Sequence, residues 1–214
     1  MISFSCPSCG RSFAVPDSAV GRRAKCNGCG SELVVPTQST RNATVVAPAA
    51  AGATPKVAPR TRRLVAEHEQ MQKAFAGFDP IRIKSVVGNP PEEYEIEYHV
   101  MSYEPGATPD AEPSPRGVHS VKIELTSDYP RLSPRCKMLT PIFHPNFDET
   151  TICVGDHWTA GERLVDLVVR IGEMIGYQAY NIKSPLNGEA AMWSDLNGKK
   201  LPSDSRSMRP PTLE

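Results

Sequence analysis

Hydrophobic and polar residues alternate along several short stretches between residues 81 and 139, which is the pattern of half-buried β-strands. The clearest stretch is residues 94–103, where one face carries Tyr94, Ile96, Tyr98 and Val100. The same pattern predicts further strands over residues 81–87, 118–126 and 135–139. Loops rich in Pro and Gly separate these stretches, so we expect an antiparallel meander with one face toward water.

A period of three to four residues predicts two helices that flank the strands. The first covers residues 60–76, where one stripe contains Leu64, His68, Met71 and Phe75. The second lies within residues 162–180, where one stripe contains Leu164, Val168, Ile171 and Ile175. A helix followed by a meander and a further helix predicts an α+β fold rather than a doubly wound one.

The first 36 residues contain two Cys-x-x-Cys pairs, Cys6/Cys9 and Cys26/Cys29, each followed directly by glycine. Each pair can form a tight turn whose two sulfurs converge on one metal, and two such turns give a closed tetrahedral site. We therefore predict a zinc ribbon over residues 1–36 with a structural Zn²⁺. A redox dithiol is the weaker alternative because no βαβ pattern surrounds either pair, and a disulfide would need an oxidising compartment.

Composition divides the rest of the chain. Residues 37–59 contain no aromatic residue, Leu or Ile and are dominated by Ala, Thr and Pro, which predicts a flexible linker. Residues 60–197 carry the strand and helix patterns and are expected to form one domain. The residues that follow, 198–214, have no such pattern, and we predict a disordered tail.

Charge is unevenly distributed although the chain as a whole is neutral. Residues 1–63 contain nine Lys and Arg against two Asp and Glu, a net charge of +7, and the remainder carries −7. Such a basic segment favours acidic partners, but it lacks the interleaved aromatic residues that would favour nucleic acid. No stretch approaches the roughly 18 apolar residues of a membrane span, and no signal peptide is recognised. We expect no membrane association and a reduced, cytoplasmic location.

Several short motifs occur in a fixed order after residue 128. Tyr129-Pro130 and Ser133-Pro134 precede the strand 135–139, and His144-Pro145-Asn146 and then Ile152-Cys153 follow it. Pro185-Leu186-Asn187 and Glu189-Ala190-Ala191 stand further along. This order resembles that of ubiquitin-conjugating enzymes over residues 60–197. The resemblance implies a UBC-like fold with an N-terminal helix, a four-stranded meander, an active-site loop and a central helix.

The resemblance also implies a site centred on Cys153, which would carry a ubiquitin-like modifier as a thioester. The modifier would come from an activating enzyme and pass to a lysine of a target protein. Asn146 would donate to the oxyanion or hold the loop, and His144 would shape the turn. Asn181 and Ser184 would lie where the incoming amine arrives. The arginines at the start of helix 60–76 would dock the activating enzyme, and these are Arg60, Arg62 and Arg63.

Some features leave alternatives open. Cys136 alternates with charged residues on a predicted strand and is expected in the core, which leaves Cys153 in a polar loop as the reactive thiol. His157 is a hypothetical base because it is the nearby group that titrates near neutrality. The chain could instead be a non-catalytic scaffold of the same fold, or a zinc-ribbon adaptor. The short spacings around Cys153 and the leading ribbon suggest a bacterial conjugation system.

Overall fold

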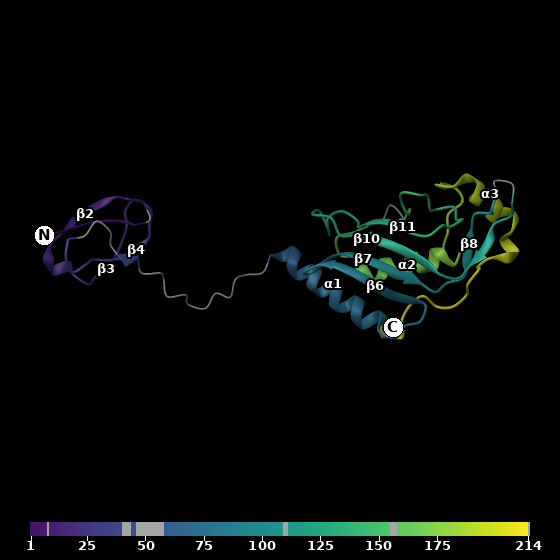
Figure 1. Ribbon diagram of the computed structural model, residues 1–214, viewed down its shortest axis with the longest axis horizontal. Coiled ribbons are helices and arrows are strands. Elements are labelled where there is room, and N and C mark those ends of the chain that lie inside the picture. The colour runs from purple at the N-terminus through teal and green to yellow at the C-terminus, as the bar shows by residue number, and fades with distance from the viewer. Residues whose placement is uncertain (8, 40–43, 46–57, 109–110, 155–157, 214) are drawn as a thin grey trace. The chain divides into compact units, whose positions relative to one another are not determined.

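The computed structural model describes residues 1–7, 9–39, 44–45, 58–108, 111–154 and 158–213. The chain forms two compact units, Met1–Lys56 and Val57–Glu214 (Figure 1). Within the described residues, no helix is both long enough and apolar enough to cross a membrane.

The first unit consists of short strands around a small apolar core. β1 (Ile2–Ser5) pairs with β2 (Ser12–Val15), and a 3-10 helix, η1 (Asp17–Ala19), follows. A three-stranded antiparallel sheet contains β3 (Arg23–Lys25), β4 (Glu32–Val34) and β5 (Thr44–Val45). The buried apolar side chains are Ile2, Phe4, Leu33 and Val35, together with Cys6 and Cys26.

β5 lies within residues 37–59, which were expected to be a linker, and it extends the ribbon sheet by pairing with Leu33 and Val34. Residues 40–43 and 46–57 of the expected linker lie outside the described part of the chain.

The second unit begins with α1 (Pro59–Phe75), which precedes an antiparallel sheet of strand order β11-β10-β7-β6. The strands are β6 (Ile81–Gly88), β7 (Pro91–Tyr98), β10 (His119–Glu124) and β11 (Arg135–Met138). The later helices are α2 (Leu164–Ile175), α3 (Gly188–Leu196), η2 (Gly198–Lys200) and η3 (Pro211–Leu213). This arrangement confirms the predicted α+β fold of helix, meander and central helix.

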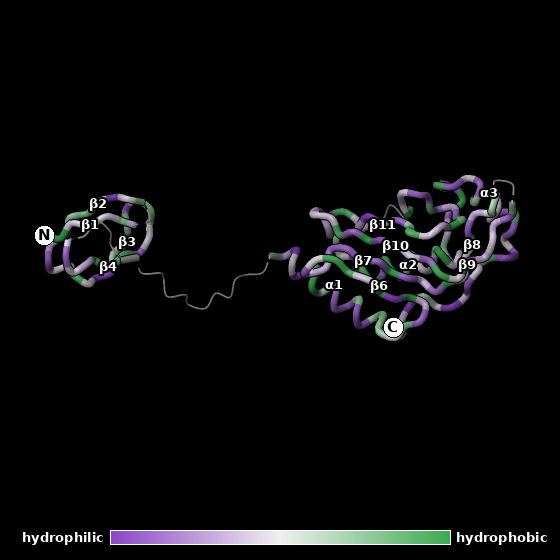
Figure 2. Tube along the Cα trace, in the orientation of Figure 1, coloured by the Kyte–Doolittle hydropathy of each residue, from purple (hydrophilic) through white to green (hydrophobic). Residues whose placement is uncertain are grey.

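The predicted apolar stripes meet in one core. Hydrophobic and hydrophilic residues are interspersed along the strands and helices that supply them (Figure 2). Tyr94, Ile96 and Tyr98 of β7 are 0% exposed, as is the α2 stripe. The Tyr98 hydroxyl donates to the carbonyl of Val168 at 3.0 Å. A Cβ atom at Gly172 would lie 3.2 Å from the Tyr98 ring, so glycine permits the close approach of α2 and β7. The other face of the sheet carries charged residues, as expected for a meander with one wet face.

The strand predicted over residues 94–103 is two elements. β7 ends at Tyr98, and β8 (Ser102–Glu104) pairs with β9 (Ser114–Arg116) in a separate hairpin. Between them the backbone bonds to the C-terminal segment: Met101 N–H donates to Asp204 at 3.0 Å, and Arg206 donates to the His99 carbonyl at 2.5 Å. Because Val100 stays buried, the alternation continues through the break and gives no sign of it.

The expectation of a disordered tail at residues 198–214 is wrong for the part that the structure describes, up to residue 213. Met208 is 0% exposed in the main core, and Asp204 is 8% exposed. Gln178 donates to the carbonyls of Asp204 at 2.8 Å and Arg206 at 2.7 Å. The segment is therefore packed against the end of α2 through single buried side chains that follow no period.

Candidate active site

Cys153 is an exposed thiol on a segment that is fixed from both sides. On one side, Ile152 N–H donates to the carbonyl of Cys136 in β11 at 3.1 Å. On the other side, Ile152 forms a β-bridge with Phe147, and Cys153 N–H donates to the carbonyl of Asn146 at 2.9 Å. Ile152 is 4% exposed and anchors the segment, which leaves the next side chain in solvent. The order across this region is β11, the Cys153 segment and residues 146–147.

The other unassigned cysteine, Cys136, is in the core, as predicted. Its side chain is 6% exposed, and burial raises the pKa of its thiol to about 12. A thiol in this environment is protonated and shielded from reagents. Of the two cysteines of the second unit, Cys153 is therefore the one with an exposed thiol.

His144 is a buried, neutral residue that shapes the turn before Asn146. Its ring is 0% exposed and packs against Tyr177 and Phe147, with ring centroids 4.4 and 4.6 Å away. Its Nδ1 accepts the N–H of Asn146 at 3.1 Å. Burial lowers the pKa of His144 to about 3, although the backbone of Met174 opposes this shift. The enclosed ring is therefore neutral, and it stabilises the turn through this hydrogen bond.

Asn146 joins the Cys153 segment to the loop that follows α2. Its amide nitrogen donates to the carbonyl of Asn181 at 2.8 Å, and its amide oxygen accepts the N–H of Asn181 at 2.7 Å. The side chain is 3% exposed, so its amide group is enclosed by these contacts. Of the two roles expected for Asn146, the structure displays that of holding the loop.

Pro145 makes a second connection to the same loop. Its carbonyl accepts the N–H groups of Leu186 at 2.7 Å and Asn187 at 3.0 Å. Asn187 then caps α3, because its side chain accepts the N–H of Ala190 at 3.0 Å. The triplet therefore holds the loop at Asn181 and at Leu186–Asn187, and Ser184 is exposed between these two attachments. Residue types do not predict the attachment by the Pro145 carbonyl, since a backbone acceptor leaves no signal in the sequence.

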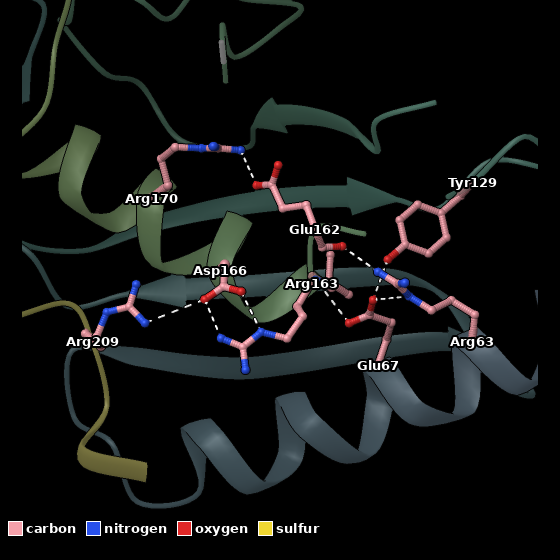
Figure 3. Close-up of polar contacts among 9 residues, drawn as sticks. Arg63, Glu67, Tyr129, Glu162, Arg163, Asp166, Arg170 and Arg209 are labelled. Carbon is pink, nitrogen blue, oxygen red and sulfur yellow. Dashed lines mark hydrogen bonds and ion pairs between the residues drawn. The ribbon is translucent and has the colours of Figure 1, made fainter. Parts of the chain in front are cut away.

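Glu67 is the centre of the polar contacts that fix the chain after Cys153 (Figure 3). Its carboxylate is 1% exposed and accepts from the Tyr129 hydroxyl at 2.8 Å, from Leu164 N–H at 2.9 Å and from Arg63. Arg63 also donates to the carbonyls of Ala160 and Glu162. Residues 160–164 are thus held against α1 and the Tyr129-Pro130 turn.

Trp158 fixes the beginning of this segment. Its indole N–H donates to the Pro130 carbonyl at 2.8 Å, and its ring packs against Tyr129 with centroids 5.8 Å apart. His157, the hypothetical base, lies outside the described residues.

Two of the three arginines expected to dock a partner have partners within the fold. Arg60 pairs with Glu92 and donates to the carbonyls of Leu125 and Thr126 at 3.1 and 2.9 Å. Arg63 is bound to Glu67 as described. Arg62 is exposed. The internal partners of Arg60 and Arg63 explain a basic first turn that the helix dipole does not favour.

The four cysteines of the first unit form one cluster. Their sulfurs all lie within 4.8 Å of one another, with Cys6–Cys29 at 3.7 Å and Cys9–Cys26 at 3.6 Å. Four sulfurs about 2.3 Å from a central zinc would be about 3.8 Å apart in a tetrahedron. Gly10 and Gly30 have φ angles of +72° and +75° and donate to the carbonyls of Cys6 and Cys26, so the turns are equivalent. The cluster can hold a metal ion.

A helix, a four-stranded antiparallel sheet and an exposed cysteine beside a His-Pro-Asn turn define the class of ubiquitin-conjugating folds. A family model described as "Ubiquitin-conjugating enzyme" matches residues 97–204, about half of the chain. The chain belongs to the ubiquitin-conjugating enzyme family.

Individual relatives of the chain are also described as ubiquitin-conjugating enzymes. The chain is 37% identical over 89 residues to "Ubiquitin-conjugating enzyme E2-23 kDa" of Triticum aestivum, covering 38% of this chain and 47% of that protein. It is 28% identical over 139 residues to "Ubiquitin-conjugating enzyme E2 N" of Drosophila melanogaster, covering 62% and 82%. A solved structure described as "Novel Ubiquitin-Conjugating Enzyme" has a TM-score of 0.48 and 20% identity, covering 66% of this chain and 89% of that one.

Proposed function

We propose that the protein carries a ubiquitin-like modifier as a thioester on Cys153 and transfers it to a lysine of a target protein. The observation that supports this most directly is that the His144–Asn146 turn holds both the exposed Cys153 and the loop of Asn181 and Ser184. Membership of the family supports conjugation in general. The partners that follow are an activating enzyme, the modifier and the target.

The proposed reaction has two acyl transfers. The Cys153 thiolate attacks the thioester carbonyl on the activating enzyme, and the cysteine thiolate of that enzyme leaves. The lysine nitrogen then attacks the thioester on Cys153, the carbon–sulfur bond breaks, and an isopeptide bond forms. The amine loses its proton to solvent or a base, and Cys153 is regenerated as thiolate. ATP is consumed earlier, by the activating enzyme.

The proposed roles of the neighbouring residues differ in kind. Asn146 is a positioning residue, since its amide holds the backbone of Asn181. His144 supports the turn as a neutral ring. Ser184 is exposed beside the path of the amine, and its hydroxyl can accept a hydrogen bond from the incoming lysine. Arg62 is the most accessible of the three arginines proposed to contact the activating enzyme.

We also propose that the ion held by Cys6, Cys9, Cys26 and Cys29 is zinc, and that it has a structural role. Four thiolates suit Zn²⁺ and leave no open coordination position. A unit with so few buried apolar side chains gains folding energy from the metal. Residues 1–36, extended by β5, would then be a zinc ribbon, and the chain between β5 and α1 would join it to the domain that contains Cys153. None of the six cysteines forms a disulfide, which suits a reducing compartment such as the cytoplasm.

The test is thioester formation with the cognate activating enzyme, modifier and ATP, followed on a non-reducing gel. We expect an adduct that a thiol reagent removes and that Cys153→Ala abolishes, whereas Cys136→Ala retains it. If a verified cognate set gives no adduct, or if Cys153→Ala still forms it, the proposal is wrong.

A further inference from the structure

A groove of about 640 Å³ lies between α3 and the chain that connects β8 to β9, at one end of the second unit (Figure 1). We call it the α3 groove. None of residues 152–154 lines it, so the exposed thiol of Cys153 lies outside it. Its lining includes Glu112, Phe143, Glu189, Met192, Trp193 and Leu196.

Trp193 fixes the two walls of the groove against each other. Its indole N–H donates to the carboxylate of Glu112 at 3.0 Å, which joins α3 to the connection between β8 and β9. Its ring packs against Tyr103 of β8 and against Phe143, with ring centroids 4.8 and 5.9 Å away. The groove is therefore formed before a ligand arrives, which lowers the cost of binding.

α3 turns its large apolar side chains toward the groove and its small ones toward the protein. Its buried residues are Ala190, Ala191 and Ser194, whereas Met192 is 64% exposed and Leu196 is 78% exposed. Met192 and Leu196 are four positions apart, so they lie on the same face of the helix. A helix usually buries its large apolar side chains, and exposed ones that gather beside a groove are typical of an interaction site.

The charge of the groove is negative and is not neutralised by the fold. Glu112 and Glu189 are the charged residues of its described lining, and both are exposed. Glu112 accepts from a neutral indole, and among the described residues no basic group lies within 4.0 Å of either carboxylate. Lys200 lies 5.6 Å from the centre of the Trp193 ring, but it does not line the groove. A ligand that fills the groove therefore gains from a cation beside its apolar groups.

We propose that the α3 groove binds a segment of a partner protein in which large apolar side chains stand next to Lys or Arg. The apolar side chains cover Met192 and Leu196, and the cation pairs with Glu112 or Glu189. A volume of about 640 Å³ is in the range of sites for drug-sized ligands, so it holds a few side chains of a short segment. This site goes beyond the proposed function, because none of these contacts involves Cys153.

Other occupants match the groove less well. A purely apolar molecule leaves both carboxylates without a partner, and an acidic segment is repelled by them. A second copy of the chain offers Arg131 and Leu132, which form an exposed pair of a basic and an apolar residue. The Arg131 guanidinium, however, already pairs with Asp128 at 2.8 Å.

The test follows the NMR signals of the two tryptophan indoles in the full-length protein. Trp193 reports on the groove, and Trp158, whose indole donates to Pro130 outside it, is an internal control. Three acetylated peptides of equal length carry Leu and Phe with Arg, Leu and Phe with Glu, or Ala with Arg. We expect the first peptide to shift the Trp193 signal with a dissociation constant about tenfold lower than those of the other two, and to leave the Trp158 signal unchanged.

A first variant tests the apolar part of the site. Met192→Ser/Leu196→Ser should weaken binding of the first peptide about tenfold, because it removes the apolar surface that the peptide covers. The matched control is Val87→Ser/Leu132→Ser, which changes residues that are 60% and 61% exposed outside the groove and should bind like the wild type.

A second variant tests the charged part. Glu112→Gln/Glu189→Gln keeps an acceptor for the Trp193 indole and should reduce the preference for the Arg peptide over the Glu peptide to within about twofold. The matched control Glu69→Gln/Glu149→Gln makes the same change at exposed positions outside the groove and should preserve the preference.

Equal affinities for the three peptides would overturn the inference. So would the absence of a Trp193 shift at millimolar peptide, or a groove variant that binds like the wild type. Sedimentation velocity of the protein alone tests the second copy as the occupant, and we expect the wild type and Met192→Ser/Leu196→Ser to sediment alike. A dimer that this variant converts to a monomer, and that Val87→Ser/Leu132→Ser retains, would assign the groove to a second copy and refute the proposed partner.

Discussion

Replacing Glu67 by glutamine tests whether one buried carboxylate holds α1, the Tyr129-Pro130 turn and the segment after Cys153 together. The change preserves size and removes one negative charge. The side chain of Glu67 is 2% exposed, so water cannot replace what is lost. Three donors converge on the carboxylate, from Arg63, Tyr129 and Leu164. Glutamine leaves one oxygen to accept and turns an NH₂ group toward the remaining donors.

The magnitude follows from the environment of the pair. Breaking a buried ion pair from one side costs about 3–5 kcal/mol, and hydrogen bonds to a charged group contribute about 1.5–3 kcal/mol each. The Arg63 side chain is 27% exposed, so its guanidinium regains some hydration and the cost is reduced. We therefore expect Glu67→Gln to lower the free energy of unfolding of the Cys153 unit by about 2–4 kcal/mol.

Tryptophan fluorescence during urea unfolding of the full chain measures this quantity. The chain has two tryptophans, and both Trp158 and Trp193 lie in the second unit, so the signal reports that unit alone. Glu69→Gln is the matched control, because it makes the same change at an exposed position of α1 and should cost less than about 0.5 kcal/mol.

A double-mutant cycle isolates the pair. Arg63→Met and Glu67→Gln together should cost less than the sum of the two single changes, because each variant alone leaves the other group without its partner. If Glu67→Gln costs less than about 1 kcal/mol, or if the two changes are additive, the carboxylate does not organise these three segments.

Four further measurements follow from the same structure. Burial lowers the pKa of His144 to about 3, so NMR should show no titration of its ring between pH 8 and 5. In the unfolded chain the ring has the ordinary pKa of 6.5, so the stability contributed by the neutral ring is complete above pH 6.5. This stability falls as the pH drops from 6.5 toward 3, by up to about 1.4 kcal/mol per pH unit. Asn146→Ala should speed hydrogen exchange at Asn181 and slow transfer from Cys153, and unchanged exchange would exclude a loop-holding role. Met208→Ala should destabilise the second unit by about 2–5 kcal/mol, whereas a free tail predicts no change in urea unfolding. Native mass spectrometry should detect one bound zinc ion, and a chelator or any single Cys→Ser change in the cluster should remove it. The amide NMR signals of the first unit should then lose their dispersion, because the unit unfolds without its metal, while the tryptophan unfolding curve of the second unit stays unchanged.

The parts of the fold that the sequence predicted are those in which burial follows a simple period. β6, β10, β11, α1 and α2 lie where alternation or a helical stripe placed them, and β7 does so up to its end at Tyr98. The equivalent turns at Gly10 and Gly30 were predictable as well, because the cysteine spacing dictates the turn and the turn requires positive φ. Periodicity works here because each of these elements buries one face against a single core.

The missed features depend on single contacts between distant residues. Met208 enters the core alone, from a segment with no apolar repeat, and Asp204 accepts from Met101 across more than a hundred residues of chain. In the same region β7 ends at Tyr98 and β8 pairs with β9 instead of continuing the main sheet. The same limit applies to Arg60 and Arg63. Their charge was visible in the sequence, but the carbonyls and carboxylates that occupy them belong to segments brought close only by folding.

Asn146 shows how this limit affects the site itself. Residue type and spacing identify it, yet they leave two roles open, since an amide can stabilise an oxyanion or hold a loop. In the structure both ends of the amide are bonded to the backbone of Asn181, and the side chain is 3% exposed. The second N–H of the amide is not used by these bonds, but the side chain is so enclosed that direct contact with a developing oxyanion would require the 181–187 loop to move. If that movement accompanies transfer, the exchange rate of the Asn181 amide should rise when Cys153 is charged, and a rate that stays constant would assign Asn146 to positioning alone.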